Sequence, residues 1–389
     1  MNDTQQADPA VLEQMQNKLT GYIEKKRASS YQIITSIEDD CRLIYDYLVP
    51  ANKILFHFNG EPIEKPEMPV EMVFEDENGK NKYLTLHDNS IVQLGQKLNI
   101  PTKYLKDLVH GTHDSDNQDE YWQKELASRI LTNHVINSRK ERYLIRAVGN
   151  EARGVLSDSF KRMNSIKLYS TFLHAANNSG CVVTGAWYDG LTGFVEVLRP
   201  DVITIPTENN GIQYICFGVQ FRNSDFGVSS LEMRAFNFVI KCENGWISQS
   251  VLRNVHLGAR LPDNLQLSEE TYRLDTETKA SLVNDTIGQI INPEKIYEYS
   301  VKVQEASKIQ INIENEVKNL NNLNVLDHET ESIKKLLMEN DPNNNIQGAN
   351  TLFKLTQALS AVSRDSTESR KRELDEITGK LFDRVKVNQ

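Results

Sequence analysis

Apolar residues recur every three or four positions near the start of the chain, at Leu12, Met15, Leu19 and Ile23. This spacing places them on one face of a helix, because an α-helix completes a turn every 3.6 residues. The sequence therefore predicts a helical region over residues 10–48.

A two-residue alternation then replaces the helical spacing. Val70, Met72 and Phe74 lie on one side of a predicted strand whose other side carries two glutamates. An Asn-Gly turn at Asn78-Gly79 and a second apolar run over 83–86 follow. This combination predicts a β-hairpin.

Strands dominate the middle of the chain. The pattern predicts one helix over 164–176, and strands ending at Val148 and over 153–158, 181–187, 194–199, 202–205, 212–222 and 231–242. Several of these strands are apolar on both sides. That is typical of a sheet that is covered on both faces.

The rest of the chain has a helical pattern. Apolar residues keep a strict three-four alternation from Ile296 to Leu320, with Gln310 at one position of this seam. A seam this regular favours pairing with another helix, although an amphipathic helix that lies on its own domain has the same spacing. Two more helices are predicted over 352–362 and 374–385.

Together these elements predict an α+β protein with a central, mostly antiparallel sheet and packed helices. The 389 residues are enough for two or three domains. We expect an N-terminal helical and β-hairpin region over 1–124, a central α+β sheet domain over 125–262 and a helical C-terminal region over 263–389.

The overall charge is acidic, with 44 Lys and Arg against 54 Asp and Glu and a net charge of -10. This excludes the basic composition of a general nucleic-acid coat protein, but it is compatible with a local basic face. No stretch approaches the roughly 18–20 apolar residues of a bilayer span. The first ten residues are polar and lack the apolar core of a signal peptide. We therefore expect a cytoplasmic protein without a membrane partner.

No motif for a cofactor stands out, and we assign neither a cofactor nor a catalytic residue. The four cysteines lie far apart, which predicts buried thiols rather than a zinc site; they are Cys41, Cys181, Cys216 and Cys242. Two weaker patterns keep a metal-dependent nuclease open as a second alternative function. The first consists of Asp263, Glu277 and Lys279, and the second of His110 and His113 with Asp114, Asp116 and Asp119.

Four segments carry a resemblance to a known family. Residues 146–164, RAVGNEARGVLSDSFKRMN, and residues 217–245, with NSDFG and CENG, resemble two signatures of the phage/plasmid-like domain-of-unknown-function 932 family. Residues 94–104 and 351–382 are similar to its upstream motif and helical tail. Asp225-Phe226 departs from the Glu-Val of the family. The resemblance implies a phage or plasmid protein acting in the cytoplasm of a bacterial host, and it carries over no catalytic position.

Positive charge is concentrated in the middle of the chain. Nine basic and three acidic residues lie between Arg129 and Lys167, as expected for a face that contacts phosphates. Tyr143, Phe160 and Tyr169 would add base stacking. The candidate nucleic-acid-binding residues are Arg139, Lys140, Arg142, Arg146, Arg153, Lys161 and Arg162. Pairing of these cations with acidic residues of the same chain is the competing interpretation.

We therefore expect a non-enzymatic protein that binds single-stranded DNA or RNA in annealing or protection. The first alternative is an interaction or structural protein that binds a host or virion protein. In either case the seam from Ile296 to Leu320 predicts self-association or a protein partner at the C-terminal helices.

Overall fold

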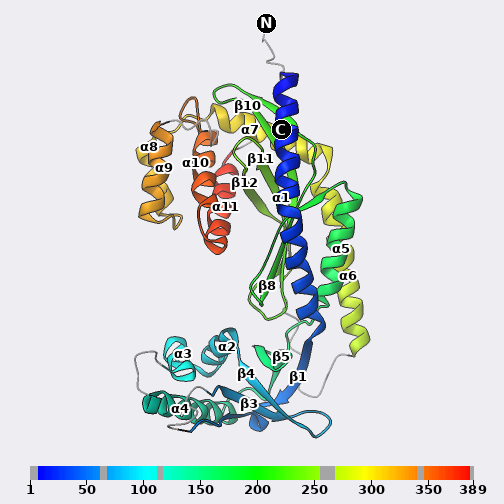
Figure 1. Ribbon diagram of the computed structural model, residues 1–389, viewed down its shortest axis with the longest axis vertical. Coiled ribbons are helices and arrows are strands. Elements are labelled where there is room, and N and C mark those ends of the chain that lie inside the picture. Colours follow the sequence, from blue (N-terminus) through cyan, green and yellow to red (C-terminus); the bar gives the residue numbers. More distant parts are fainter. Residues whose placement is uncertain (1–7, 62–67, 112–116, 255–267, 340–345, 386–389) are drawn as a thin grey trace.

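The computed structural model has two lobes stacked along the long axis of the molecule (Figure 1). It describes residues 8–61, 68–111, 117–254, 268–339 and 346–385. The chain begins in the larger lobe, crosses to the smaller lobe between α1 (Pro9–Arg42) and β1 (Ile44–Pro50), and returns between β6 (Glu151–Leu156) and α5 (Ser165–Asn178).

The smaller lobe is a six-stranded sheet with three helices. Its other strands are β2 (Leu55–Phe58), β3 (Val70–Glu75), β4 (Asn81–Leu86) and β5 (Arg142–Val148). The strand order is β1-β5-β6-β4-β3-β2, antiparallel except between β4 and β6. Its helices are α2 (Asp88–Leu98), α3 (Thr102–His110) and α4 (Asn117–Ile136), and they cover a core that includes Met72, Ile91 and Leu131.

The predicted hairpin is confirmed as β3 and β4. Gly79 has a φ of 74°, which a residue with a side chain rarely adopts. The carboxylate of Asp76 accepts hydrogen bonds from the backbone N–H groups of Asn78 and Lys80 and so fixes the turn.

The larger lobe contains an antiparallel sheet in the order β12-β11-β10-β8-β7, and β9 also pairs with β10. Its strands are β7 (Val182–Tyr188), β8 (Thr192–Leu198), β9 (Ile203–Thr207), β10 (Gly211–Ser224), β11 (Leu231–Val239) and β12 (Asn244–Asn254). The strand β12 is an addition to the strands expected from the sequence. The α+β class itself is confirmed.

Helices cover both faces of this sheet (Figure 1). One face packs on α5, α6 (Glu269–Ile290) and α7 (Pro293–Lys308) through residues such as Val219 and Phe221. The opposite face packs on α1 through Cys216 and Phe238. The last two helices, α10 (Leu352–Arg364) and α11 (Glu368–Phe382), lie beside β12.

The seam over 296–320 is not one helix. It divides into α7 and α8 (Ile313–Asn321), and Gln310 between them pairs with Thr351 in a β-bridge. The seam residues Val303, Ala306 and Leu320 are buried in the core that α9 (Asp327–Glu339), α10 and α11 complete. The apolar spacing therefore reflects packing within this chain, which removes the reason for expecting self-association here.

Sheet membership divides the chain differently from the expected domains. The expected boundary after residue 124 lies inside α4, and β5 and β6 complete the sheet of the smaller lobe. The cause is the long-range pairing of β5 with β1, which a local pattern does not reveal. Residues 44–48, expected to be helical, form most of β1. The other expected boundary, after residue 262, lies outside the described residues.

Over the residues that the structure describes, every helix is too short or too polar to cross a membrane.

Candidate functional site: a basic cleft between the lobes

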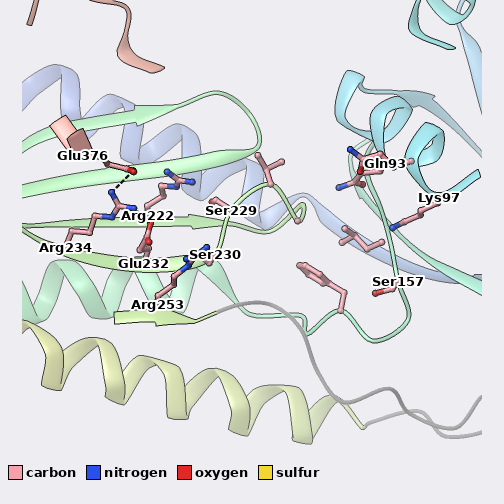
Figure 2. Close-up of a pocket in the computed structure, with 15 residues that line it drawn as sticks. Gln93, Lys97, Ser157, Arg222, Ser229, Ser230, Glu232, Arg234, Arg253 and Glu376 are labelled. Atoms are coloured by element: carbon pink, nitrogen blue, oxygen red, sulfur yellow. Dashed lines mark hydrogen bonds and ion pairs between the residues drawn. The ribbon is translucent and has the colours of Figure 1, made fainter. Parts of the chain in front are cut away.

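A polar cleft of about 680 Å³ lies where the two lobes meet (Figure 2). We call it the interlobe cleft. Gln93, Lys97 and Ser157 line it from the smaller lobe. Facing them, the larger lobe contributes Arg222, Ser229, Ser230, Glu232, Arg234, Arg253 and Glu376. The lining thus contains four basic and two acidic side chains.

The strand register brings the larger-lobe residues together. Arg222 on β10 lies opposite Glu232 on β11, which lies opposite Arg253 on β12. Because side chains alternate between the faces of a sheet, these three residues share one face with Arg234, two positions further along β11. This face is apolar where α1 covers it and charged at the end nearest the smaller lobe.

The acidic side chains of the cleft are already bound to one arginine. Arg234 forms ion pairs with Glu232 at 3.0 Å and with Glu376 at 2.5 Å. In contrast, the side chains of Lys97, Arg222 and Arg253 form no hydrogen bond or ion pair with any residue in the described ranges. The cleft therefore presents positive charge from both lobes that the chain itself does not neutralise.

Lys97 on α2 extends this positive surface to Lys140, one of the residues predicted from the sequence. Burial lowers the pKa of the Lys97 ammonium, and the charge of the nearby Lys140 lowers it further. Like charges repel, so an anion bound beside Lys97 would be favoured. Lys140 does not line the interlobe cleft itself, but its charge acts on Lys97, which does.

One turn of the larger lobe holds the wall of the cleft against α2. The amide of Gln93 donates to the carbonyl of Phe226 and accepts from the N–H of Val155, at 2.8 and 2.7 Å. Gly227 has a φ of 75°, and a Cβ there would lie 2.7 Å from Leu156.

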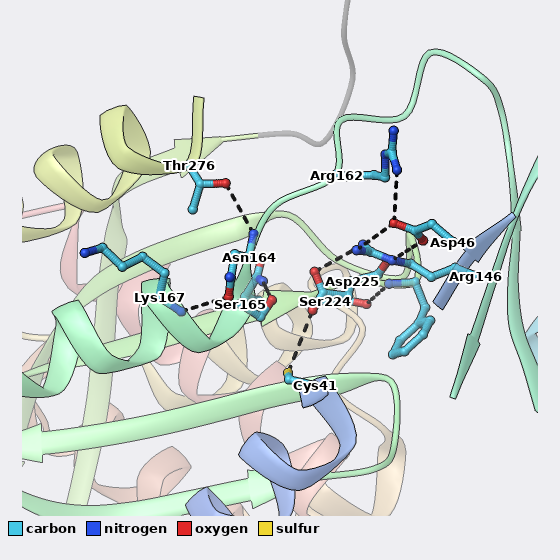
Figure 3. Close-up of polar contacts among 12 residues, drawn as sticks. Cys41, Asp46, Arg146, Arg162, Asn164, Ser165, Lys167, Ser224, Asp225 and Thr276 are labelled. Atoms are coloured by element: carbon cyan, nitrogen blue, oxygen red, sulfur yellow. Dashed lines mark hydrogen bonds and ion pairs between the residues drawn. The ribbon is translucent and has the colours of Figure 1, made fainter. Parts of the chain in front are cut away.

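None of the candidate nucleic-acid-binding residues lines the interlobe cleft, and Figure 3 shows two of them, Arg146 and Arg162, at the junction of the lobes. Arg146 is only 4% exposed and contacts Asp46 at 2.9 Å and Asp225 at 3.3 Å. Arg153 binds Asp40 at 2.5 Å and the carbonyl of Gly190 at 3.0 Å. Both arginines belong to the sheet of the smaller lobe, and their partners lie either in the larger lobe or in that same sheet.

Three more of the candidates are also ion-paired, as the competing interpretation expected. Arg142 contacts Asp158, Lys161 contacts Asp275, and Arg162 contacts both Asp46 and Glu269. The guanidinium of Arg162 also lies 4.1 Å from the ring centre of Tyr272. Only Arg139 and Lys140 are exposed without an ion-pair partner in the described part of the chain.

The three aromatic residues expected to stack on bases are buried. Tyr143 and Tyr169 belong to the cores of the smaller and larger lobe, and Phe160 is 6% exposed at the floor of the interlobe cleft. The expectation that they stack on bases was wrong for the two tyrosines, because a fully buried ring has no free face.

The nuclease pattern is not assembled as its chemistry requires. Glu277 and Lys279 lie on helix α6, not on a strand, and they pair with Lys167 and Asp275. Asp263 lies outside the described residues. In the second pattern His110 contacts Asp88 at 2.6 Å, while His113, Asp114 and Asp116 lie outside the described residues. No group of metal-binding side chains was found among the residues that the structure describes.

The cysteines are free thiols, as expected, and three of them are buried. Burial raises the pKa of Cys181 to about 11 and that of Cys216 to about 12. A thiol with a raised pKa is a poor nucleophile at neutral pH.

Comparisons with family models, curated proteins and solved structures found no match for this chain.

Sequence reasoning missed Arg222, Arg234 and Arg253. A signal was present, because Gln220 and Arg222 alternate with apolar residues in β10, and Glu232 and Arg234 do the same in β11. The sequence analysis assigned none of these polar positions to a common face of the sheet.

Proposed function

We propose that the protein binds single-stranded nucleic acid in the interlobe cleft, through contacts with the phosphate backbone. The observation that carries this proposal is the set of four cations without acidic partners in the described residues. They are Lys97, Lys140, Arg222 and Arg253. Lys and Arg that are free of internal ion pairs supply the salt-sensitive, sequence-independent part of nucleic-acid affinity.

The polar lining supports a strand rather than an apolar small molecule. Gln93, Gln96, Ser157 and Ser230 add hydrogen-bonding groups beside the cations. A groove that stacks bases usually has exposed aromatic rings, whereas the aromatic residue that lines this cleft, Phe160, is nearly buried. Affinity would then come from phosphates, with little preference for base sequence.

Fluorescence anisotropy with a labelled thymidine oligomer of about 20 nucleotides tests the proposal. Four phosphate contacts predict that log K falls with log salt with a slope of about -3. Replacing both Arg222→Gln and Arg253→Gln should weaken binding at least about tenfold at low salt and halve this slope.

The matched control removes two charges far from the cleft. Lys25 on α1 and Lys318 on α8 are exposed, and no ion pair in the described residues involves them. The Lys25→Gln, Lys318→Gln protein should bind like the unmodified protein. Equal losses in both double variants would mean that only net charge matters, and absence of binding to DNA and RNA at low salt would refute the proposal and favour a protein partner.

A further inference from the structure

Two buried donors at one corner of the interlobe cleft lack acceptors. The Nε of Arg222 and the Oγ of Ser229 are shielded from solvent and have no hydrogen-bond partner within the described residues. Arg222 lies near the end of β10, and Ser229 lies in the turn that joins β10 to β11. Both line the cleft beside Arg253 (Figure 2).

Such donors are unfavourable in an empty site. A buried polar group without a partner destabilises the folded protein, and nearly all such groups in folded proteins are satisfied by protein, water or ligand. An acceptor group that enters this corner would recover that cost. It would meet the planar fork of Arg222, the hydroxyl of Ser229 and the guanidinium of Arg253.

We infer that this corner is a subsite for a phosphomonoester, such as the phosphate at the end of a strand. A phosphomonoester has three terminal oxygens and a charge of about -1.5 to -2, whereas a phosphodiester offers two such oxygens and one charge. The larger number of acceptors matches the several donors that Arg222, Ser229 and Arg253 contribute to this part of the lining. Arginine also binds phosphate oxygens in a bidentate manner, which lysine does not.

The carboxylate nearest this corner does not occupy the donors. Glu232 lies between Arg222 and Arg253 in the strand register, but its Oε2 is bound by Arg234 at 3.0 Å. Arg234 is held in turn by Glu376. Glu232, Arg234 and Glu376 are thus linked by ion pairs, and Arg222 and Arg253 lie on either side of Glu232 in the strand register.

This inference rests on the proposed function, because that function supplies the ligand. The experiment tests the phosphomonoester subsite separately from nucleic-acid binding. Affinities are measured for oligonucleotides with a hydroxyl or a phosphate at the 5′ or 3′ end, for a thymidine mononucleotide, and for inorganic phosphate alone. We expect a terminal phosphate to strengthen binding of the oligonucleotide about tenfold, an effect of about 1.4 kcal/mol.

Three variants test the assignment of the donors. Ser229→Ala should abolish the preference for a terminal phosphate, measured as the ratio of the affinities of the phosphate-ended and hydroxyl-ended oligonucleotides. Arg222→Lys keeps the charge but removes the Nε donor, so it should reduce the same preference. Ser170→Ala is the control, since this serine is exposed on α5 and its hydroxyl donates only to the carbonyl of Lys167 among the described residues.

Each result decides one of the two claims. Equal affinity for phosphate-ended and hydroxyl-ended oligonucleotides would overturn the subsite while the proposed function stands. Binding of inorganic phosphate that Ser229→Ala removes, without binding of any oligonucleotide, would support the subsite and overturn the proposed function. A mononucleotide that binds as tightly as the phosphorylated oligonucleotide would identify free nucleotides, rather than strand ends, as the source of the phosphomonoester.

Discussion

Replacing Arg146 with methionine tests whether the basic segment of the sequence holds the lobes together. In the folded protein the guanidinium contacts Asp46 and Asp225 at 2.9 and 3.3 Å, and it donates to the carbonyl of Asp225 at 3.0 Å. The side chains of Arg146 and Asp225 are each 5% exposed. Arg146→Met therefore leaves two buried carboxylates that have lost their main cation.

Breaking a buried pair by removing one partner typically costs about 3–5 kcal/mol, because the remaining charge is uncompensated. We expect a loss of this size in the free energy of unfolding at about pH 7. Urea denaturation with tryptophan fluorescence measures it. The control is Arg139→Met, which removes an exposed cation without an ion-pair partner in the described residues and should change stability by less than about 0.5 kcal/mol.

The pH dependence gives this experiment a second readout. Burial raises the pKa of Asp46, while Arg146 and Arg162 lower it, so loss of Arg146 should raise it further. A carboxyl whose pKa is higher in the folded than in the unfolded state contributes stability at low pH and loses it as the pH rises through the folded pKa. The difference between Arg146→Met and the unmodified protein should therefore grow from acid to neutral pH. A loss below about 1 kcal/mol that is independent of pH would refute the reasoning.

Two further substitutions test the buried polar groups and the turn. Burial raises the pKa of Glu196, whose carboxylate accepts hydrogen bonds from Thr184 and Gln220. Glu196→Gln should therefore stabilise the protein increasingly as the pH rises from about 4 to 7. Denaturation curves across this pH range measure the difference in stability, and a difference that is constant with pH would contradict the prediction. Gly227→Ala places a side chain at a φ of 75° and against Leu156, so it should cost about 1–3 kcal/mol. The control is Gly21→Ala in α1, where an added Cβ would contact nothing, and this variant should not destabilise the protein. Equal thermal stability of the two variants would show that the turn at Gly227 tolerates a side chain.

The elements that the sequence predicted well are those with a local cause. The hairpin at Asn78-Gly79, helix α5 and strands β7 to β11 follow from spacing, turn residues and caps that are close together in the chain. The long α1 follows from Asp8, whose carboxylate caps the first turn, and from Pro9 at its first position. In contrast, β1 joins a sheet whose next strand lies far along the sequence, and no local pattern reports that pairing.

The site was harder to predict because charge density along a sequence differs from charge density in space. Arg146 has no acidic neighbour within four positions, yet folding brings Asp46 and Asp225 to it from two distant segments. Arg222 and Arg253 are isolated in sequence and are brought to one face only by the register of three antiparallel strands. A count of neighbouring charges therefore selected mainly cations that are paired with acidic residues from other parts of the chain.

The junction and the interlobe cleft meet at one turn. Arg146 binds the carboxylate and carbonyl of Asp225, and two residues further on Gly227 lines the cleft. Between them, the carbonyl of Phe226 accepts from Gln93. The arginine that holds the lobes together therefore also fixes the turn that brings α2 and Lys97 opposite the arginines of the large sheet. Both walls of the cleft thus meet at a turn that Arg146 contacts at Asp225 and Gln93 contacts at Phe226.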